Sequence, residues 1–120
     1  MWQENMSLQK GKHHEDRALA FLQNQGLMLK ARNFYSRHGE IDLIMHERKI
    51  LVFIEVRYRK SSRFGSALES VTLQKQQKIM KTAEYYLQNF DIGDKIGTRF
   101  DVVAITSCQF SWVKNAFGAV

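Results

Sequence analysis

Two carboxylates in this chain stand inside segments that are otherwise apolar. Asp42 lies in the segment 39–44 (GEIDLI), and Glu55 lies in the segment 52–57 (VFIEVR). A charge inside a buried sheet is costly unless it is paired or bound to a metal ion. Carboxylate oxygens are ligands that divalent cations such as Mg²⁺ prefer. The pattern therefore predicts a metal site.

Two strands must position these acids. Residues 40–46 and 50–58 alternate between polar and apolar side chains, as strands do, and a short polar segment joins them as a hairpin turn would. Glu40 and Arg57 are expected on the face that carries the two acids. The opposite face is expected to be core, and its members are Ile41, Leu43, Met45, Val52, Ile54 and Val56.

The register of this hairpin decides whether the acids meet. With a loop of two residues, Glu47 and Arg48, or with a loop of four, residue 42 lies opposite residue 53. Asp42 and Glu55 are then diagonal neighbours on one face, with Cα atoms roughly 7–8 Å apart. Carboxylates that converge at this spacing can share a divalent cation. A loop of three residues would instead place them on opposite faces.

The first helix is expected over residues 7–25, ended by Gly26 at the position after its last turn. Its apolar stripe includes Ala18, Leu19 and Leu22, and Glu15 falls on the same side. An acid on the apolar side of a helix needs an explanation. A functional role and an ordinary salt bridge at the edge of the stripe are both open.

A second helix is expected to begin at Ser70 or Thr72 and to end at Phe90. Its expected apolar stripe consists of Leu73, Met80, Ala83, Leu87 and Phe90. The other expected strands are 27–34, 99–106 and 109–113, with turns or loops at 35–39, 59–66 and 91–97. The order is therefore α-β-β-β-α-β-β.

Composition narrows the class of protein. The chain of 120 residues fits one domain, 1–120, and its net charge of +6 favours a polyanionic partner, nucleic acid above all. No apolar run approaches the roughly 20 residues that span a bilayer, and no signal-peptide core is visible. Cys108 stands alone, and no Cys/His group has zinc spacing. We expect a cytoplasmic protein that does not enter a membrane.

Several motifs together resemble one known family. An acid in the first helix (Glu15), an Asp in one strand and Glu-x-basic in the next resemble the PD-(D/E)xK nuclease superfamily. More closely, segments 39–44 and 53–59 look like the bacterial YraN-like family, uncharacterised protein family 0102. Segments 11–18, 75–79, 100–103 and 112–117 also fit this family. The family is similar to Holliday-junction resolvases and consists of predicted endonucleases.

The resemblance implies an α/β fold with a mixed sheet, a restriction-endonuclease-like core with helices flanking the sheet. It also implies that Glu15, Asp42 and Glu55 bind one or two Mg²⁺ or Mn²⁺ ions. The superfamily's catalytic Lys falls on Arg57 in this chain. Arg stays protonated at neutral pH and cannot act as a base, although it can clamp a phosphate. Either Arg57 keeps that electrostatic role, or Lys75 supplies the ammonium group, or activity has been lost.

The expected substrate is DNA, with branched or repair intermediates as candidates. The residues expected to hold phosphates are Arg57, Arg59, Lys60, Arg63, Lys75 and Lys78. Tyr85 and Tyr86 could stack on bases, although one of them is as easily explained by helix packing. His13, His14 and His38 are read as surface residues. Resolvases work as dimers, so a homodimer stands beside DNA as an expected partner.

Two other functions stay open at this point. The first is a nuclease-like fold that binds nucleic acid without cutting it, which the exchange of Lys for Arg57 favours. The second is a partner-binding protein whose acids form internal salt bridges with Arg57 and Arg99. The three acids favour the enzyme, because a groove that only binds phosphate gains nothing from negative charge.

Overall fold

The computed structural model describes residues 2–59, 68–106 and 109–118. Its elements are α1 (Trp2–Asn24), β1 (Met28–Ser36), β2 (Gly39–Glu47), β3 (Ile50–Tyr58), the short 3₁₀ helix η2 (Leu68–Ser70), α2 (Leu73–Asn89), β4 (Gly97–Ile105) and β5 (Phe110–Phe117). The expected order is confirmed, with η2 added. Cys108 and residues 60–66 of the expected loop lie outside the described residues.

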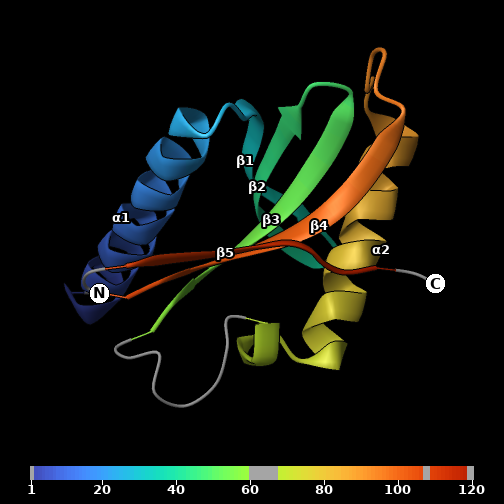
Figure 1. Cartoon of the computed structure of the whole chain (residues 1–120). Coiled ribbons are helices and arrows are strands. Elements are labelled where there is room, and N and C mark those ends of the chain that lie inside the picture. The colour runs from blue at the N-terminus through green and yellow to red at the C-terminus, as the bar shows by residue number, and fades with distance from the viewer. Residues whose placement is uncertain (1, 60–67, 107–108, 119–120) are drawn as a thin grey trace.

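The five strands form one mixed sheet in the order β1-β2-β3-β4-β5. β3 and β4 run parallel, and the other neighbouring pairs are antiparallel. α1 covers one face of the sheet and α2 covers the other, as Figure 1 shows. This confirms the expected α/β class and is compatible with a restriction-endonuclease-like core. Among the described residues, no helix has the length and apolar character needed to cross a membrane.

Because helices cover both faces, the central strands are buried on both sides. Side chains that pack toward α1 form one core, which comprises Ala18, Leu22, Leu27, Leu43, Met45, Val52, Ile54, Val103 and Ile105. A second core packs against α2 and comprises Ile41, Ile44, Leu51, Phe53, Val71, Ile79, Ala83, Tyr86, Val102 and Ala104. The expectation of a single apolar strand face was therefore incomplete. Ile41 was wrongly grouped with Leu43, because Ile41 packs in the core against α2 and Leu43 packs in the core against α1.

The β2–β3 hairpin has a register two residues away from the expected one. The turn residues are Arg48 and Lys49, and Glu47 pairs with Ile50. Extending this register places Asp42 directly opposite Glu55 instead of on a diagonal. A shift of two residues preserves the face of every side chain. The two acids do come together, because their carboxyl groups are hydrogen-bonded to each other, although the expected pairing of the strands was wrong.

The buried side of α2 also differs from the expected stripe. Its buried residues are Ile79, Thr82, Ala83 and Tyr86, whereas Leu73 is 75% exposed. The buried side of α2 is therefore rotated by about one residue from the expected stripe. Apolar residues lie on both edges of the buried side, so the sequence pattern did not define its centre. Thr82 can face the core because its hydroxyl donates to the Lys78 carbonyl at 2.8 Å. Thr72 caps the helix by accepting a hydrogen bond from the Lys75 N–H.

Candidate metal centre

The candidate site lies where β2 and β3 separate. Their pairing ends at Leu43 and Ile54. Beyond that point β2 pairs only with β1, and β3 continues beside β4. The backbone N–H of Val56 thus loses its strand partner, and it donates instead to Oδ2 of Asp42 at 2.8 Å. The fork explains how a carboxylate is accommodated inside an apolar segment.

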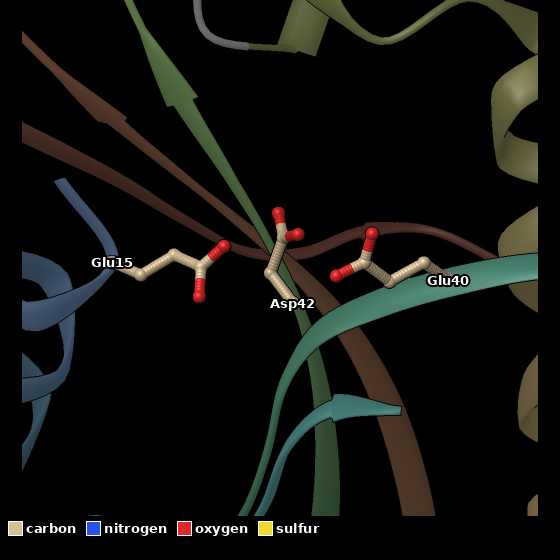
Figure 2. Close-up of side chains that lie close together, drawn as sticks. All are labelled: Glu15, Glu40 and Asp42. Carbon is tan, nitrogen blue, oxygen red and sulfur yellow. The ribbon is translucent and has the colours of Figure 1, made fainter. Parts of the chain in front are cut away.

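Three carboxylates converge at this fork. One oxygen each from Glu15, Glu40 and Asp42 lies within 4.8 Å of the other two. Figure 2 shows Glu15 reaching in from α1 and Glu40 from β2, with Asp42 between them. Glu15 is next to the buried Ala18 and Leu22 stripe of α1, and its side chain is 15% exposed. Hard oxygen donors in this number could hold a metal ion.

Glu40 was not expected as a ligand, although the strand pattern placed it on the acid face. It enters the group because residues two apart on a strand point the same way, so Glu40 lies beside Asp42. That parity was the signal that could have found it.

Asn33 on β1 holds two of these acids in place. Its side-chain amide donates to Oε1 and Oε2 of Glu15 at 2.9 and 3.1 Å, and to Oε1 of Glu40 at 2.8 Å. The backbone of Asn33 is left-handed, with φ of 49°. Asn tolerates this conformation better than most residues. Asn33 therefore links α1 to β2 through the two carboxylates, a role that sequence reasoning missed.

Glu55 lies on the other side of Asp42. It is 5% exposed, and burial, together with the nearby charge of Asp42, raises its pKa to about 8. A hydrogen bond between the two carboxyl groups contributes to this increase. Glu55 does not join the convergent group of Glu15, Glu40 and Asp42. Of the three acids expected to bind metal, the structure thus brings Glu15 and Asp42 together and places Glu55 against Asp42.

The electrostatics of the site favour a bound cation. Burial raises the pKa of Asp42, and burial also raises the pKa of Glu15, to which the charges of Asp42 and Glu40 add. Arg32 offers partial compensation at 3.7 Å from Glu15, but it bonds Asp16 more closely, at 2.7 Å. Four carboxyl groups therefore face one another with limited positive charge, and a divalent ion would relieve this repulsion.

Both basic residues considered for catalysis act on this site. Lys75 lies in the first turn of α2. Its charge partly offsets the rise in pKa that burial causes in Asp42 and Glu55. Arg57 has a smaller effect of the same kind on Glu55. Lys75 is thus the stronger electrostatic neighbour of the buried pair, although it lies twenty residues after Glu55 in the sequence.

The expected phosphate-binding residues lie at or just beyond the end of β3, on α2, or outside the described residues. Arg57 and Arg59 lie at the end of β3 and just beyond it, and the Arg59 N–H donates to the Ile105 carbonyl at 2.8 Å. Lys75 and Lys78 lie on α2, and the Lys78 side chain is exposed. Lys60 and Arg63 lie outside the described residues. Of the histidines, His13 is exposed, His38 is half-buried, and His14 stacks on Tyr58 with ring centroids 4.0 Å apart.

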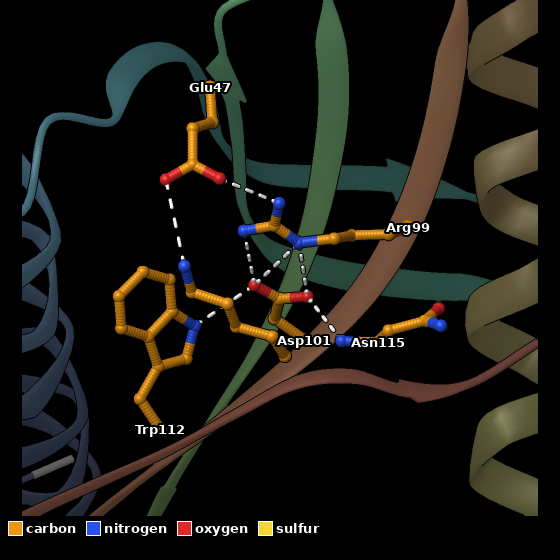
Figure 3. A network of polar contacts seen from close by, with 6 residues as sticks. Glu47, Arg99, Asp101, Trp112 and Asn115 are labelled. Carbon is orange, nitrogen blue, oxygen red and sulfur yellow. Dashed lines mark hydrogen bonds and ion pairs between the residues drawn. The ribbon is translucent and has the colours of Figure 1, made fainter.

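A second polar group lies away from these acids. Asp101 is fully buried, and its carboxylate accepts hydrogen bonds from Arg99, from the indole of Trp112 at 2.9 Å and from the backbone of Asn115 at 3.0 Å. Arg99 also donates to Glu47 at 2.8 Å (Figure 3). Arg99 therefore pairs with Asp101 and Glu47 and not with the expected metal ligands. This network secures β5 on β4 across a shift in their register.

The model of uncharacterised protein family UPF0102 matches residues 14–105. The chain belongs to this family. A UPF0102 protein of Legionella pneumophila strain Corby is 47% identical over 116 residues, covering 95% of this chain and 98% of that protein. Another, from Saccharophagus degradans, is 52% identical over 96 residues, covering 80% of this chain and 81% of the relative. A third, from Enterobacter sp. strain 638, is 49% identical over 111 residues and covers 92% and 85%.

The UPF0102 match confirms the family expected from the sequence motifs. It spans every expected site residue, from Glu15 to Lys78. The names of the UPF0102 relatives state no activity, so function has to be argued from the site itself.

Proposed function

We propose that this protein is a cytoplasmic, Mg²⁺- or Mn²⁺-dependent endonuclease that hydrolyses phosphodiester bonds in DNA, with branched or repair intermediates as substrates. The observation that carries the proposal is the convergence of Glu15, Glu40 and Asp42 within 4.8 Å at the β2–β3 fork. The net charge of +6 makes a polyanionic substrate the best match.

The donor set fits a hard divalent cation, since it consists of carboxylate oxygens. Glu15, Glu40 and Asp42 would hold the ion, with Glu55 as a further ligand once it has lost its proton. A divalent ion bound there would supply Lewis-acid activation and would neutralise charge on the phosphate. In the reaction a water oxygen bonds to phosphorus and gives up a proton, while one ester P–O bond breaks and the departing oxygen takes up a proton, which leaves a phosphate monoester on one end of the cut strand and a hydroxyl on the other.

The basic residues of the chain have separate roles in this scheme. Lys75 faces the buried pair of acids and is suited to offset negative charge on the scissile phosphate. Arg57 is suited to clamp a non-bridging phosphate oxygen through its planar guanidinium group. Lys78 and Arg59 are suited to contacts with flanking phosphates, which position nucleic acid without reading its sequence.

A non-catalytic nucleic-acid-binding protein is the second candidate. Arg57 in the place of the superfamily's Lys favours it, because Arg cannot exchange a proton at neutral pH. The position of Lys75 beside Asp42 and Glu55 weighs against it, because an ammonium group is still present at the site.

A cleavage assay separates the two candidates. Purified protein is incubated with linear, single-stranded and four-way-branched DNA, with Mg²⁺, with Mn²⁺ or with chelator. Asp42→Asn is run in parallel, purified in the same way. The nuclease proposal expects metal-dependent cleavage that Asp42→Asn abolishes. Cleavage that is equal in both preparations would identify a contaminant, and binding without cleavage in any metal would leave the second candidate.

A further inference from the structure

A hollow of about 550 Å³ lies between the β1–β2 turn and α2. Two of its lining residues, Arg37 and His38, belong to the turn, and the others come from α2: Lys81, Glu84, Tyr85 and Gln88. None of these residues was among the expected phosphate-binding residues. The hollow is separate from the carboxylate site, although both use the segment around β2.

The β1–β2 turn is fastened to α2. Ser36 lies 3.3 Å from the Thr82 hydroxyl, oxygen to oxygen, and its own hydroxyl accepts a hydrogen bond from the His38 N–H at 3.0 Å. Gly39 has φ of +148° and lies so close to α2 that a Cβ would contact Lys78 and Thr82 at 3.6 and 3.7 Å. Arg37 and His38 are therefore held at a defined position relative to α2.

The same turn leads directly into the metal centre. His38 precedes Glu40 by two residues and Asp42 by four. Four residues of strand span about 13 Å, which equals roughly four nucleotide steps at about 3.4 Å each. On α2, Lys75, Lys78 and Lys81 follow one another at intervals of three residues, from the acids toward the hollow. A strand bound at the metal centre can thus reach the hollow along a row of ammonium groups.

The lining of the hollow combines charge with an available ring. Arg37 and Lys81 carry positive charge against the single acid Glu84, so the net charge is positive. Tyr85 is 44% exposed, whereas Tyr86 is buried in the core at 6%. Of the two tyrosines, Tyr85 is therefore the one whose ring is accessible for stacking on a base. The Tyr85 ring also packs against Phe34, with ring centroids 6.2 Å apart.

We propose that this hollow binds an unpaired nucleotide of the substrate strand, about four nucleotides from the bond that is cut at the metal centre. Arg37 and Lys81 contact its phosphate, and the Tyr85 ring stacks on its base. The proposal rests on the proposed nuclease function for the identity of the ligand. It adds that the enzyme selects DNA with an unpaired segment about four nucleotides from the scissile phosphate, because a base inside a duplex cannot reach Tyr85.

Fluorescence anisotropy of the full-length protein tests this, in chelator so that no cleavage occurs. The probes are labelled oligothymidylate of about 15 nucleotides, a length within the site sizes of single-strand binders, and a duplex of equal length. Tyr85→Ala should weaken single-strand binding by about 5- to 100-fold, and Tyr85→Phe should retain it, because stacking needs the ring and not the hydroxyl. Duplex binding should change much less in both variants.

Charge variants form the second arm. Lys81→Ala should lower the log–log salt slope for the single strand by about 0.7, the value expected for one phosphate contact. Glu84→Gln should tighten binding, because it removes the one acid of the lining. Lys49→Ala is the matched control, since Lys49 is an exposed lysine in the β2–β3 turn. Thermal unfolding of each variant verifies that the fold is intact.

Two results would overturn the proposal. One is binding by Tyr85→Ala and Lys81→Ala that equals binding by Lys49→Ala. The other is an equal loss on single strand and duplex for Tyr85→Ala. The nuclease proposal is tested separately by metal-dependent cleavage. If Tyr85→Ala loses single-strand binding and the wild type does not cleave DNA, the nucleotide-binding role of the hollow is supported and the nuclease proposal is rejected. If the wild type cleaves DNA and Tyr85→Ala binds single strand normally, only the role of the hollow is rejected.

Discussion

The carboxylate of Asp42 accepts a hydrogen bond from the backbone N–H of Val56 at 2.8 Å. In this way a side chain on β2 replaces the strand partner that β3 loses at the fork. Asp42 consequently has two tasks, to satisfy a backbone donor of a neighbouring strand and to face Glu15 and Glu40.

These two tasks can be separated by mutation. Asp42→Asn keeps a carbonyl oxygen for Val56 but removes the charge, so we expect a folded protein that binds Mn²⁺ at least tenfold more weakly. Asp42→Ala leaves the Val56 N–H without its acceptor and should lower the free energy of unfolding by about 1–3 kcal/mol. Titration calorimetry and urea denaturation measure the two effects. Equal stability of the Asn and Ala variants would contradict this division.

Asn33 should control metal affinity without touching the metal. Asn33→Gly accommodates the left-handed backbone (φ 49°) and removes only the amide that holds Glu15 and Glu40. We expect metal affinity to fall by about 10- to 100-fold, as for other residues that orient ligands. Manganese titration followed by electron paramagnetic resonance measures this. Asn33→Gln, with a longer side chain, is the comparison. Unchanged metal affinity in both variants would mean that the hydrogen bonds from Asn33 to Glu15 and Glu40 do not contribute to metal binding.

Glu55 should make the metal-free protein less stable as the pH rises. The unfolded chain loses this proton near pH 4.5, whereas the folded protein keeps it to about pH 8. The folded state therefore binds more protons between these values, so the free energy of unfolding falls with increasing pH, by up to about 1.4 kcal/mol per pH unit. Burial raises the pKa of Asp42 too, and this effect has the same sign.

The variant Glu55→Gln removes this titration and should flatten the pH dependence between about pH 5 and pH 8. Urea denaturation in chelator, repeated across that window, provides the measurement. Added Mg²⁺ should stabilise the wild type most at the alkaline end, because ligand carboxyl groups must lose their protons to bind. A slope that is the same in wild type and Glu55→Gln would show that Glu55 titrates normally.

Lys75 should matter more for cleavage than Arg57. Its charge acts on both Asp42 and Glu55, and its effect on Glu55 exceeds that of Arg57. We expect Lys75→Ala to lower kcat by about 10²–10³-fold, the range for loss of a preorganised charge at a reacting centre. Arg57→Ala should cost less, and Arg57→Lys should retain or raise activity. Single-turnover cleavage with saturating DNA ranks the variants, with Lys49→Ala as the charge-matched control, and the opposite ranking would return the catalytic role to Arg57.

Asp101 should support the fold and leave the metal centre unaffected. Its carboxylate is fully buried and bonds Arg99, Trp112 and Asn115. Asp101→Asn leaves part of the Arg99 charge unpaired and should lower the free energy of unfolding by about 3 kcal/mol or more. Denaturant titration measures the loss, and manganese affinity of the folded fraction should equal that of the wild type. A selective loss of metal affinity would show that the two polar groups are coupled.

The sequence was sufficient for the element order, which depends on residue periodicity, and it also predicted that Asp42 and Glu55 come together. It could not locate the hairpin turn. Arg48 adopts a left-handed conformation there (φ 55°) without the Asn-Gly pattern that usually marks such turns. The predicted register therefore differs by two residues from the observed one.

Contacts between elements complete the site. Glu40 and Asn33 come together through the pairing of β1 with β2, and Lys75 reaches the acids through the packing of α2 on the sheet. The contacts of Asn33 and Lys75 depend on tertiary structure and leave no periodic signal in the sequence, whereas the spacing of Glu40 from Asp42 was such a signal. Asn33 is the extreme case, because its position in the site depends on one left-handed residue within a strand.

That residue has a consequence for how the protein behaves in a crowded cell. β1 is an outermost strand of the sheet, and such a strand offers free backbone groups to any passing strand. The pairing of β1 with β2 shifts in register between Leu29 and Ala31, the exposed Lys30 adds a charge there, and Asn33 has a left-handed backbone in mid-strand. Replacement of Asn33 by a strand-forming residue such as Val would loosen the carboxylates and also straighten a surface on which chains can aggregate. We therefore expect Asn33→Val to lower both the metal affinity and the solubility of the protein.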